Sequence, residues 1–215
     1  MFASDPKQTS QKLGQRGSRG GVDQQHLLIL DLDETLVHAT DVPLPRAPDF
    51  EIPPYALYLR PGVGEFLDWA LTTFKVAVWT SSSPKYAEIV TSLLFEDLSK
   101  LEFVWARDRC TPRRDFERDV WWDSKPLHKV RRRGFDLRRV LAVDDNPEKY
   151  ARSYGNLVAV SPYHGSLDDD ELPHLRRYLE ELAIHPNVRS VEKRFWRRRL
   201  EDAGRSSSEE RDGGG

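Results

Sequence analysis

The sequence predicts an α/β fold in which a parallel sheet is covered by helices on both faces. Four continuous apolar runs have the composition of strands buried on both sides, without the polar alternation of a half-exposed strand. These runs are 26–30, 75–79, 139–143 and 157–160, with 101–105 as a further expected strand. Helical patterns lie between the runs, and strands that alternate with helices are typical of a parallel sheet.

The first two helices are predicted from apolar spacing and from signals at their ends. The segment 61–73 carries Phe66, Leu67, Ala70 and Leu71 at intervals of three and four residues. In the next helical pattern, Ser83 supplies an N-cap and Pro84 a first-turn proline. Both helices are therefore expected to pack one apolar face on the sheet.

The later helices follow from the same signals. Asn146 and Pro147 open a short helix that Gly155 could close. The segment 170–183 is amphipathic, and the acidic run 168–171 before it fits a helix start.

The 215 residues fit a single domain that is long enough to bury a core. We expect residues 1–25 to form a flexible tail, because they are polar and offer little to bury. Residues 26–190 are expected to form the domain, and residues 191–215 the end of a helix and a second tail. No targeting segment and no apolar run of about 18 residues is visible. We therefore expect a soluble cytoplasmic protein with no membrane partner.

Polar side chains follow three of the predicted strands. The segment 31–33 begins and ends with Asp, 80–83 is Thr-Ser-Ser-Ser, and 144–145 is Asp-Asp. Ligands of parallel sheets bind outside the carboxyl ends of the strands, where these segments meet. Hydroxyl residues alone would fit a simple turn. Four carboxylates at one edge repel each other, so such a cluster is expected to hold a cation or to have shifted pKa values.

These segments carry a family resemblance. The octapeptide 31–38, Asp-Leu-Asp-Glu-Thr-Leu-Val-His, resembles the first motif of haloacid dehalogenase (HAD) superfamily phosphatases. More narrowly, it resembles the branch of small RNA polymerase II C-terminal-domain phosphatases, the NLI-interacting-factor-like branch. Further matches follow in the same order at 60–67, 79–87, 125–127 and 138–147. The resemblance implies a HAD-like, Rossmann-like doubly wound sheet with a small β insert between the second and third motifs. The proline-rich stretch 40–58 is shorter than the resemblance implies for that branch, so any hairpin there is expected to be truncated.

The resemblance also implies catalytic roles. Asp31 would attack phosphorus to give an aspartyl-phosphate, and Asp33 would protonate the leaving oxygen and then activate water. Thr80, with Ser81 beside it, would bind the phosphoryl oxygens. Lys125 would neutralise those oxygens and the nucleophile, although a lone lysine there would otherwise be read as solvated.

A Mg²⁺ site is implied by the same resemblance. Its ligands would be Asp31, Asp144, Asp145 and the backbone carbonyl of Asp33. A carboxylate about 4 Å from one phosphate charge is repelled by roughly 4 kcal/mol at an effective dielectric of 20. A divalent cation between them reverses the sign of that interaction. The cluster is therefore chemically reasonable as a metal site.

The segment 107–122 is expected to form the β insert, beside the pocket. Trp121 and Trp122 could form an apolar wall for a substrate residue, or they could simply pack the insert onto the sheet. Arg113 and Arg114 belong to the stretch 107–139, which contains twelve Lys and Arg but only six Asp and Glu. We expect this excess to attract an anionic substrate.

Two classes of protein are disfavoured by composition. The Cys-x₅-Arg loop of cysteine phosphatases would need Arg at position 116, which is Phe116, and the single Cys110 cannot form an internal disulfide. A net charge of −2 argues against coating nucleic acid by bulk charge.

The leading hypothesis is a Mg²⁺-dependent phosphatase acting on phosphoserine or phosphothreonine in a protein or peptide. One alternative is the same chemistry on a nucleic-acid 3′-phosphate or a small metabolite, with nucleic acid a partner only as a phosphorylated substrate. The other alternative is a non-catalytic scaffold of the same fold.

Overall fold

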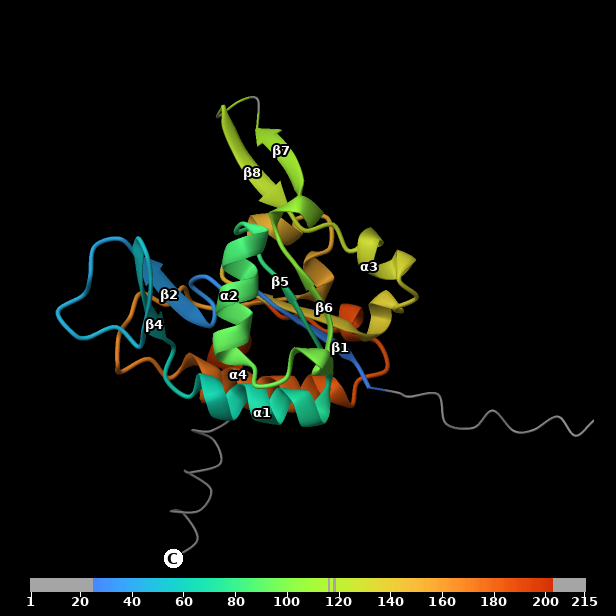
Figure 1. Ribbon diagram of the computed structural model, residues 1–215. Coiled ribbons are helices and arrows are strands. Elements are labelled where there is room, and N and C mark those ends of the chain that lie inside the picture. Colours follow the sequence, from blue (N-terminus) through green and yellow to red (C-terminus); the bar gives the residue numbers. More distant parts are fainter. Residues whose placement is uncertain (1–24, 116, 118, 203–215) are drawn as a thin grey trace, which may run out of the picture.

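A five-stranded parallel sheet forms the centre of the computed structural model, which describes residues 25–115, 117 and 119–202 (Figure 1). The strand order is β10-β9-β1-β5-β6. The bounds are β1 (Leu27–Leu30), β5 (Lys75–Trp79), β6 (Leu101–Trp105), β9 (Val140–Asp144) and β10 (Leu157–Ala159). Each strand lies on a predicted apolar run, so the predicted fold class is confirmed. The predicted tails lie outside the described residues, apart from residue 25 and residues 191–202.

Helices occupy the segments with helical periodicity. They are α1 (Val63–Thr73), α2 (Pro84–Leu94), α3 (His128–Arg132) and α4 (Glu171–Ala183). Short 3₁₀ turns are η1 (Leu98–Lys100), η2 (Arg107–Arg109), η3 (Leu137–Arg139), η4 (Pro147–Tyr150), η5 (Tyr154–Asn156) and η6 (Val188–Ser190). The Ser83 hydroxyl caps α2 by accepting the backbone N–H of Tyr86 at 3.3 Å. The prediction that Gly155 closes the helix after Asn146 is wrong, because η4 ends at Tyr150 and Gly155 lies within η5.

Alternate residues of β1 face opposite sides of the sheet, as a strand's period of two requires. Leu28 and Leu30 pack in a core shared with α1 and α4. Leu27 and Ile29 pack in a second core with residues of α3 and η4. Helices α1 and α4 lie side by side on their face of the sheet (Figure 1). Both faces are therefore covered, which explains why the central runs are continuously apolar.

A second, antiparallel sheet follows the first motif. Its strands are β2 (Val37–Thr40), β3 (Phe50–Ile52) and β4 (Tyr55–Leu59), in the order β2-β4-β3. The expected truncated hairpin is thus a three-stranded sheet. Strands of three to five residues between prolines give too little period-two signal to be seen in the sequence.

The predicted β insert is confirmed as the hairpin of β7 (Thr111–Asp115) and β8 (Val120–Ser124). It projects from one end of the molecule (Figure 1). Its register places Arg113 opposite Trp122 and Arg114 opposite Trp121.

The folded part continues beyond residue 190. Residues 196–202 are helical, and Trp196 and Leu200 are buried in the core that contains α1 and α4. Within the described part of the chain, no helix combines the length and the apolar composition that a membrane span requires.

Candidate active site

Three carboxylates meet at the carboxyl end of the parallel sheet. Asp31 follows β1 and Asp144 ends β9, and the direct pairing of these two strands places the side chains next to each other. The residue after Asp144, Asp145, adds a third oxygen, and one oxygen from each of the three lies within 4.8 Å of the others. Asp31 and Asp144 are buried, whereas Asp145 is half-buried. The structure therefore brings together the three side chains that the sequence analysis assigned to a metal.

Two lysines compensate this negative charge. Lys125 is fully buried, with Nζ 2.6 Å from Asp144 Oδ2 and 2.9 Å from Asp31 Oδ1. Lys149 donates to Asp31 Oδ2 at 2.7 Å and lies 3.2 Å from Asp144 Oδ1 and 3.9 Å from Asp145 Oδ1. The backbone connects the two lysines, because the Lys125 N–H donates to the Lys149 carbonyl at 2.8 Å.

Lys149 was missed by the sequence analysis, although the sequence contains one signal for it. It follows Asp145 by four residues, the spacing at which opposite charges pair on a helical turn. Lys125 was predicted to lie in the site. Because it is buried, the alternative that it is a solvated surface lysine is wrong.

The lysines set the ionisation of the cluster. Burial acts to raise the pKa of Asp31, but the charges of Lys125 and Lys149 outweigh it and hold the pKa below its ordinary value. Burial and the neighbouring Asp31 raise the pKa of Asp144. Burial acts to lower the pKa of both lysines, but the carboxylates raise it above the usual range. Asp31 is thus an anion between two cations at neutral pH.

Asp33 has different partners. Its Oδ2 accepts from Ser82 Oγ at 2.6 Å and from Thr80 Oγ1 at 3.4 Å, and its Oδ1 accepts from Tyr86 Oη at 2.5 Å. Burial and the charge of Asp33 raise the pKa of Tyr86, so this hydroxyl keeps its proton and donates. Asp33 and Thr80 were predicted from the sequence to lie in the site, whereas Ser82 and Tyr86 were not. Tyr86 stands one turn after the Thr-Ser-Ser-Ser segment, within a matched motif, and that was its only signal.

Ser81 lies against the insert rather than against the carboxylates. Its hydroxyl is 4.0 Å from Cys110 Sγ, and its carbonyl accepts from Arg107 Nε at 2.7 Å. Cys110 is a buried free cysteine. Ser82, the next residue, is the serine of this segment that contacts Asp33.

The insert residues do not share one environment. Trp121 is 63% exposed, with the Arg114 guanidinium 5.6 Å from its ring centroid, whereas Trp122 is half-buried. The alternative that both tryptophans pack the insert onto the sheet is wrong for Trp121. Arg114 pairs with Asp119 through Nε at 2.9 Å, and Arg113 stands opposite Trp122.

A pocket of about 450 Å³ opens beside Asp33. Its lining includes Tyr55, Tyr86 and Arg107. This pocket lies between the first motif, the start of α2 and the base of the insert, and Asp33 is part of its wall.

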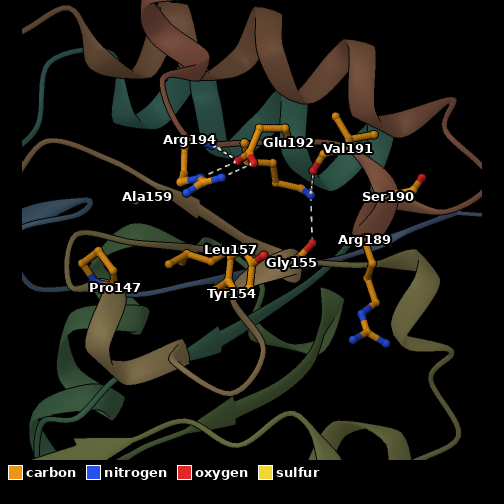
Figure 2. Close-up of a pocket in the computed structure, with 11 residues that line it drawn as sticks. Pro147, Tyr154, Gly155, Leu157, Ala159, Arg189, Ser190, Val191, Glu192 and Arg194 are labelled. Carbon is orange, nitrogen blue, oxygen red and sulfur yellow. Dashed lines mark hydrogen bonds and ion pairs between the residues drawn. The ribbon is translucent and has the colours of Figure 1, made fainter.

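Another cavity, of about 400 Å³, lies at the edge strand β10 (Figure 2). Beside it, the buried Lys193 donates to the carbonyl oxygens of Gly155 at 2.8 Å, Val191 at 2.9 Å and Val188. These three acceptors use all three N–H donors of the ammonium group. Lys193 therefore has a structural role, linking the backbone of η5 to that of η6 and the residue after it. None of the clustered carboxylates lines this cavity.

Comparisons with known proteins agree with this geometry. The family model of the NLI interacting factor-like phosphatases matches residues 26–191. The chain is 34% identical over 172 residues to human carboxy-terminal domain RNA polymerase II polypeptide A small phosphatase 1. The match covers 76% of this chain and 62% of that protein. It is 31% identical over 172 residues to Phosphatase Herzog of Drosophila melanogaster, covering 76% and 46%. The chain thus spans about half to three-fifths of the length of these relatives.

Solved structures show the same fold. The fission yeast RNA polymerase II CTD phosphatase Fcp1-R271A bound to beryllium fluoride matches with a TM-score of 0.52 at 17% identity, over 88% of this chain and 65% of that one. A second Fcp1 structure matches with a TM-score of 0.51 at 22% identity, over 74% and 50%. These matches confirm the predicted HAD-like doubly wound sheet.

Proposed function

The chain belongs to the family of NLI interacting factor-like phosphatases, and we propose that it is a Mg²⁺-dependent phosphatase acting on phosphoserine or phosphothreonine in proteins. The observation that carries the proposal is the contrast between Asp31, held by two ammonium groups, and Asp33, held by hydroxyls. One carboxylate is thereby suited to be a nucleophile and the other to transfer a proton.

The carboxylates fit a magnesium ion. Oxygens of Asp31, Asp144 and Asp145 converge within 4.8 Å, and carboxylate oxygens are the ligands that Mg²⁺ prefers. Asp31 Oδ1 is buried and accepts no well-aligned hydrogen bond within the described structure, despite its ion pair with Lys125. A bound Mg²⁺ would neutralise phosphate charge at this edge of the sheet.

In the first half of the reaction, an Asp31 oxygen forms a bond to phosphorus while the bond from phosphorus to the serine or threonine oxygen breaks. Asp33, protonated once the negative phosphate of the substrate lies beside it, gives that proton to the leaving oxygen. Lys125 stays beside Asp31 and offsets the charge of the phosphoryl group. The products of this half are an aspartyl-phosphate at Asp31 and the free hydroxyl of the substrate.

In the second half, Asp33 is a carboxylate and takes a proton from water. The water oxygen bonds to phosphorus, and the bond to Asp31 breaks. Phosphate leaves, and both aspartates regain their starting states. Ser82 and Tyr86 keep Asp33 in position through both halves, because a hydroxyl can donate to a carboxylate and can also accept from a carboxylic acid.

The choice of a phosphoprotein substrate is supported by the surroundings of the pocket beside Asp33. Arg107 and two tyrosines line it, and the base of the insert extends the wall. Such a surface offers both charge and aromatic area to a phosphorylated peptide. The relatives named as phosphatases of the RNA polymerase II carboxy-terminal domain point to the same class of substrate.

The test is a substrate panel with and without Mg²⁺. We expect Mg²⁺-dependent release of phosphate from phosphoserine and phosphothreonine peptides, and little from 3′-phosphorylated oligonucleotides or sugar phosphates. Asp68→Asn, on an exposed position of α1, should behave like the wild type, and Asp31→Asn should be inactive. Turnover of oligonucleotides or metabolites alone would contradict the substrate class, and no turnover at all would favour a scaffold.

A further inference from the structure

We propose that Lys149 is a built-in counter-ion of the metal site: its ammonium group occupies the position of Mg²⁺ in the metal-free protein and leaves when the metal binds. The proposal rests on the proposed function, since it concerns the same carboxylates. It gives Lys149 a role distinct from that of Lys125, although both lysines touch Asp31 and Asp144.

The two lysines contact different oxygens. Lys125 lies against Asp31 Oδ1 and Asp144 Oδ2. Lys149 lies against Asp31 Oδ2 and Asp144 Oδ1, and it is also the lysine near Asp145. Only Lys149 is therefore surrounded by all three carboxylates that converge as a possible metal site.

An ammonium ion and Mg²⁺ compete for these oxygens. Magnesium binds oxygen at about 2.0–2.1 Å and requires a near-octahedral shell. The Lys149 nitrogen already lies 2.7 Å from Asp31 Oδ2. A divalent cation bound to the same oxygen would stand close to the ammonium charge, and like charges at that distance repel strongly. Binding of the metal thus requires the Lys149 side chain to move.

Lys149 has room to move, unlike Lys125. Its side chain is 15% exposed, and it extends from the short turn η4 on a flexible four-carbon stem. The Lys125 side chain is completely buried beneath Asp31 and Asp144. The geometry therefore assigns Lys125 as the permanent cation and Lys149 as the exchangeable one.

Two consequences follow for the protein. In the absence of metal, Lys149 stabilises a carboxylate cluster that would otherwise repel itself. In the presence of metal, the same contacts must be given up, so Lys149 weakens the apparent affinity for Mg²⁺.

The first test compares Mg²⁺ binding by calorimetry in the wild type, Lys149→Met and Lys100→Met. Lys100 is exposed in η1, at the amino end of β6, so its loss removes one charge far from the site. We expect Lys149→Met to bind Mg²⁺ at least about tenfold more tightly than the wild type. Lys100→Met should bind like the wild type.

The outcomes separate the two proposals. Tighter binding in Lys149→Met supports the counter-ion, including the case in which the wild type binds too weakly to detect. Equal or weaker binding in Lys149→Met, with clear binding in the wild type, overturns the counter-ion and leaves the proposed function intact. No binding in any of the three proteins overturns the metal site, and the counter-ion with it.

A second test uses the unaltered protein, in case the substitution prevents folding. Lysine side chains are acetylated with and without Mg²⁺, and the modified peptides are quantified by mass spectrometry. We expect Mg²⁺ to increase modification of Lys149, while Lys100 stays equally reactive and Lys125 stays protected. Unchanged or reduced modification of Lys149 on metal addition would contradict its displacement.

Discussion

Asp31 and Asp33 are two residues apart, yet the fold gives them opposite surroundings. Ammonium groups keep Asp31 ionised, as a nucleophile requires, because they favour the charged form. Hydroxyl groups hold Asp33 without demanding one protonation state, because they can donate or accept. At the residue scale, the nature of the partner therefore suits each carboxylate to the step proposed for it.

The contact between Tyr86 and Asp33 gives the first prediction. Tyr86→Phe removes the hydroxyl that orients Asp33 and should lower kcat about tenfold, the value of one hydrogen bond to a charged group. KM for a phosphopeptide should change little. Steady-state kinetics check this, with Tyr154→Phe at an exposed position as the control. A change in KM alone would show that Tyr86 only contacts the substrate.

Glu34 gives a prediction on pH. Burial and the neighbouring Asp33 raise the pKa of Glu34 from its ordinary value of 4.5 to about 7. The folded state therefore holds the Glu34 proton more tightly than the unfolded chain, and the contribution of Glu34 to stability falls as pH rises from about 4.5 through 7.

Glu34→Gln cannot ionise and should escape this loss. In metal-free protein, the variant and the wild type should unfold at similar urea concentrations at pH 5. At pH 8 the variant should be the more stable of the two. An equal difference at both pH values would show that ionised Glu34 is not disfavoured in the folded protein.

At the scale of elements, one buried arginine connects the site to its scaffold. Arg60, directly after β4, forms a bidentate ion pair with Asp169. Its Nε lies 2.7 Å from Asp169 Oδ1 and its Nη2 lies 2.9 Å from Asp169 Oδ2. Its remaining donors reach the carbonyls of Thr35 at 3.0 Å and Ser161 at 2.9 Å. The first motif and the segment between β10 and α4 are thus held by a single side chain.

Removing that side chain should destabilise the protein strongly. Arg60→Met removes the guanidinium from two carbonyls and from Asp169, which keeps the Glu171 N–H as a donor. This loss should cost about 3 kcal/mol of unfolding free energy. Chemical denaturation measures the loss, and Arg152→Met at an exposed position provides the comparison. Equal stability of the two variants would mean that water replaces the Arg60 contacts.

The sequence was most informative where burial is uniform. Strands β1, β5 and β9 read as apolar runs because both faces are covered, and the polar residues after them could be assigned to one edge. The sheet β2-β4-β3 gave too little period-two signal, since its strands are short and lie between prolines. Lys149, Ser82 and Tyr86 depend on side-chain directions, which spacing along the chain does not determine.

At the scale of the whole molecule, charge is divided between two regions. The net charge is −2, but carboxylates gather at the sheet edge while the stretch 107–139 carries the basic excess. Within that stretch, the exposed Trp121 belongs to β8, a strand of the hairpin that projects from the molecule (Figure 1). A peptide that reaches Asp33 would therefore pass beside positive charge and one exposed aromatic surface.

Trp121→Ala should separate peptide binding from chemistry. We expect KM for a phosphopeptide to rise about tenfold, since an exposed tryptophan contributes contact area to a bound chain. Turnover of a small aryl phosphate should be unchanged, because the small substrate does not reach the hairpin. Leu167→Ala, an exposed apolar residue outside the insert, controls for surface effects. Equal effects on both substrates would place Trp121 in the fold rather than in binding.

The most direct measurement is the site of phosphorylation during turnover. The wild type is mixed with Mg²⁺ and a phosphopeptide, quenched in acid, digested and mapped by mass spectrometry. We expect a labile phosphate on Asp31, and none in Asp31→Asn under the same conditions. Phosphate on another residue, or phosphate release with no phosphorylated protein while Asp31→Asn remains active, would contradict Asp31 as the nucleophile.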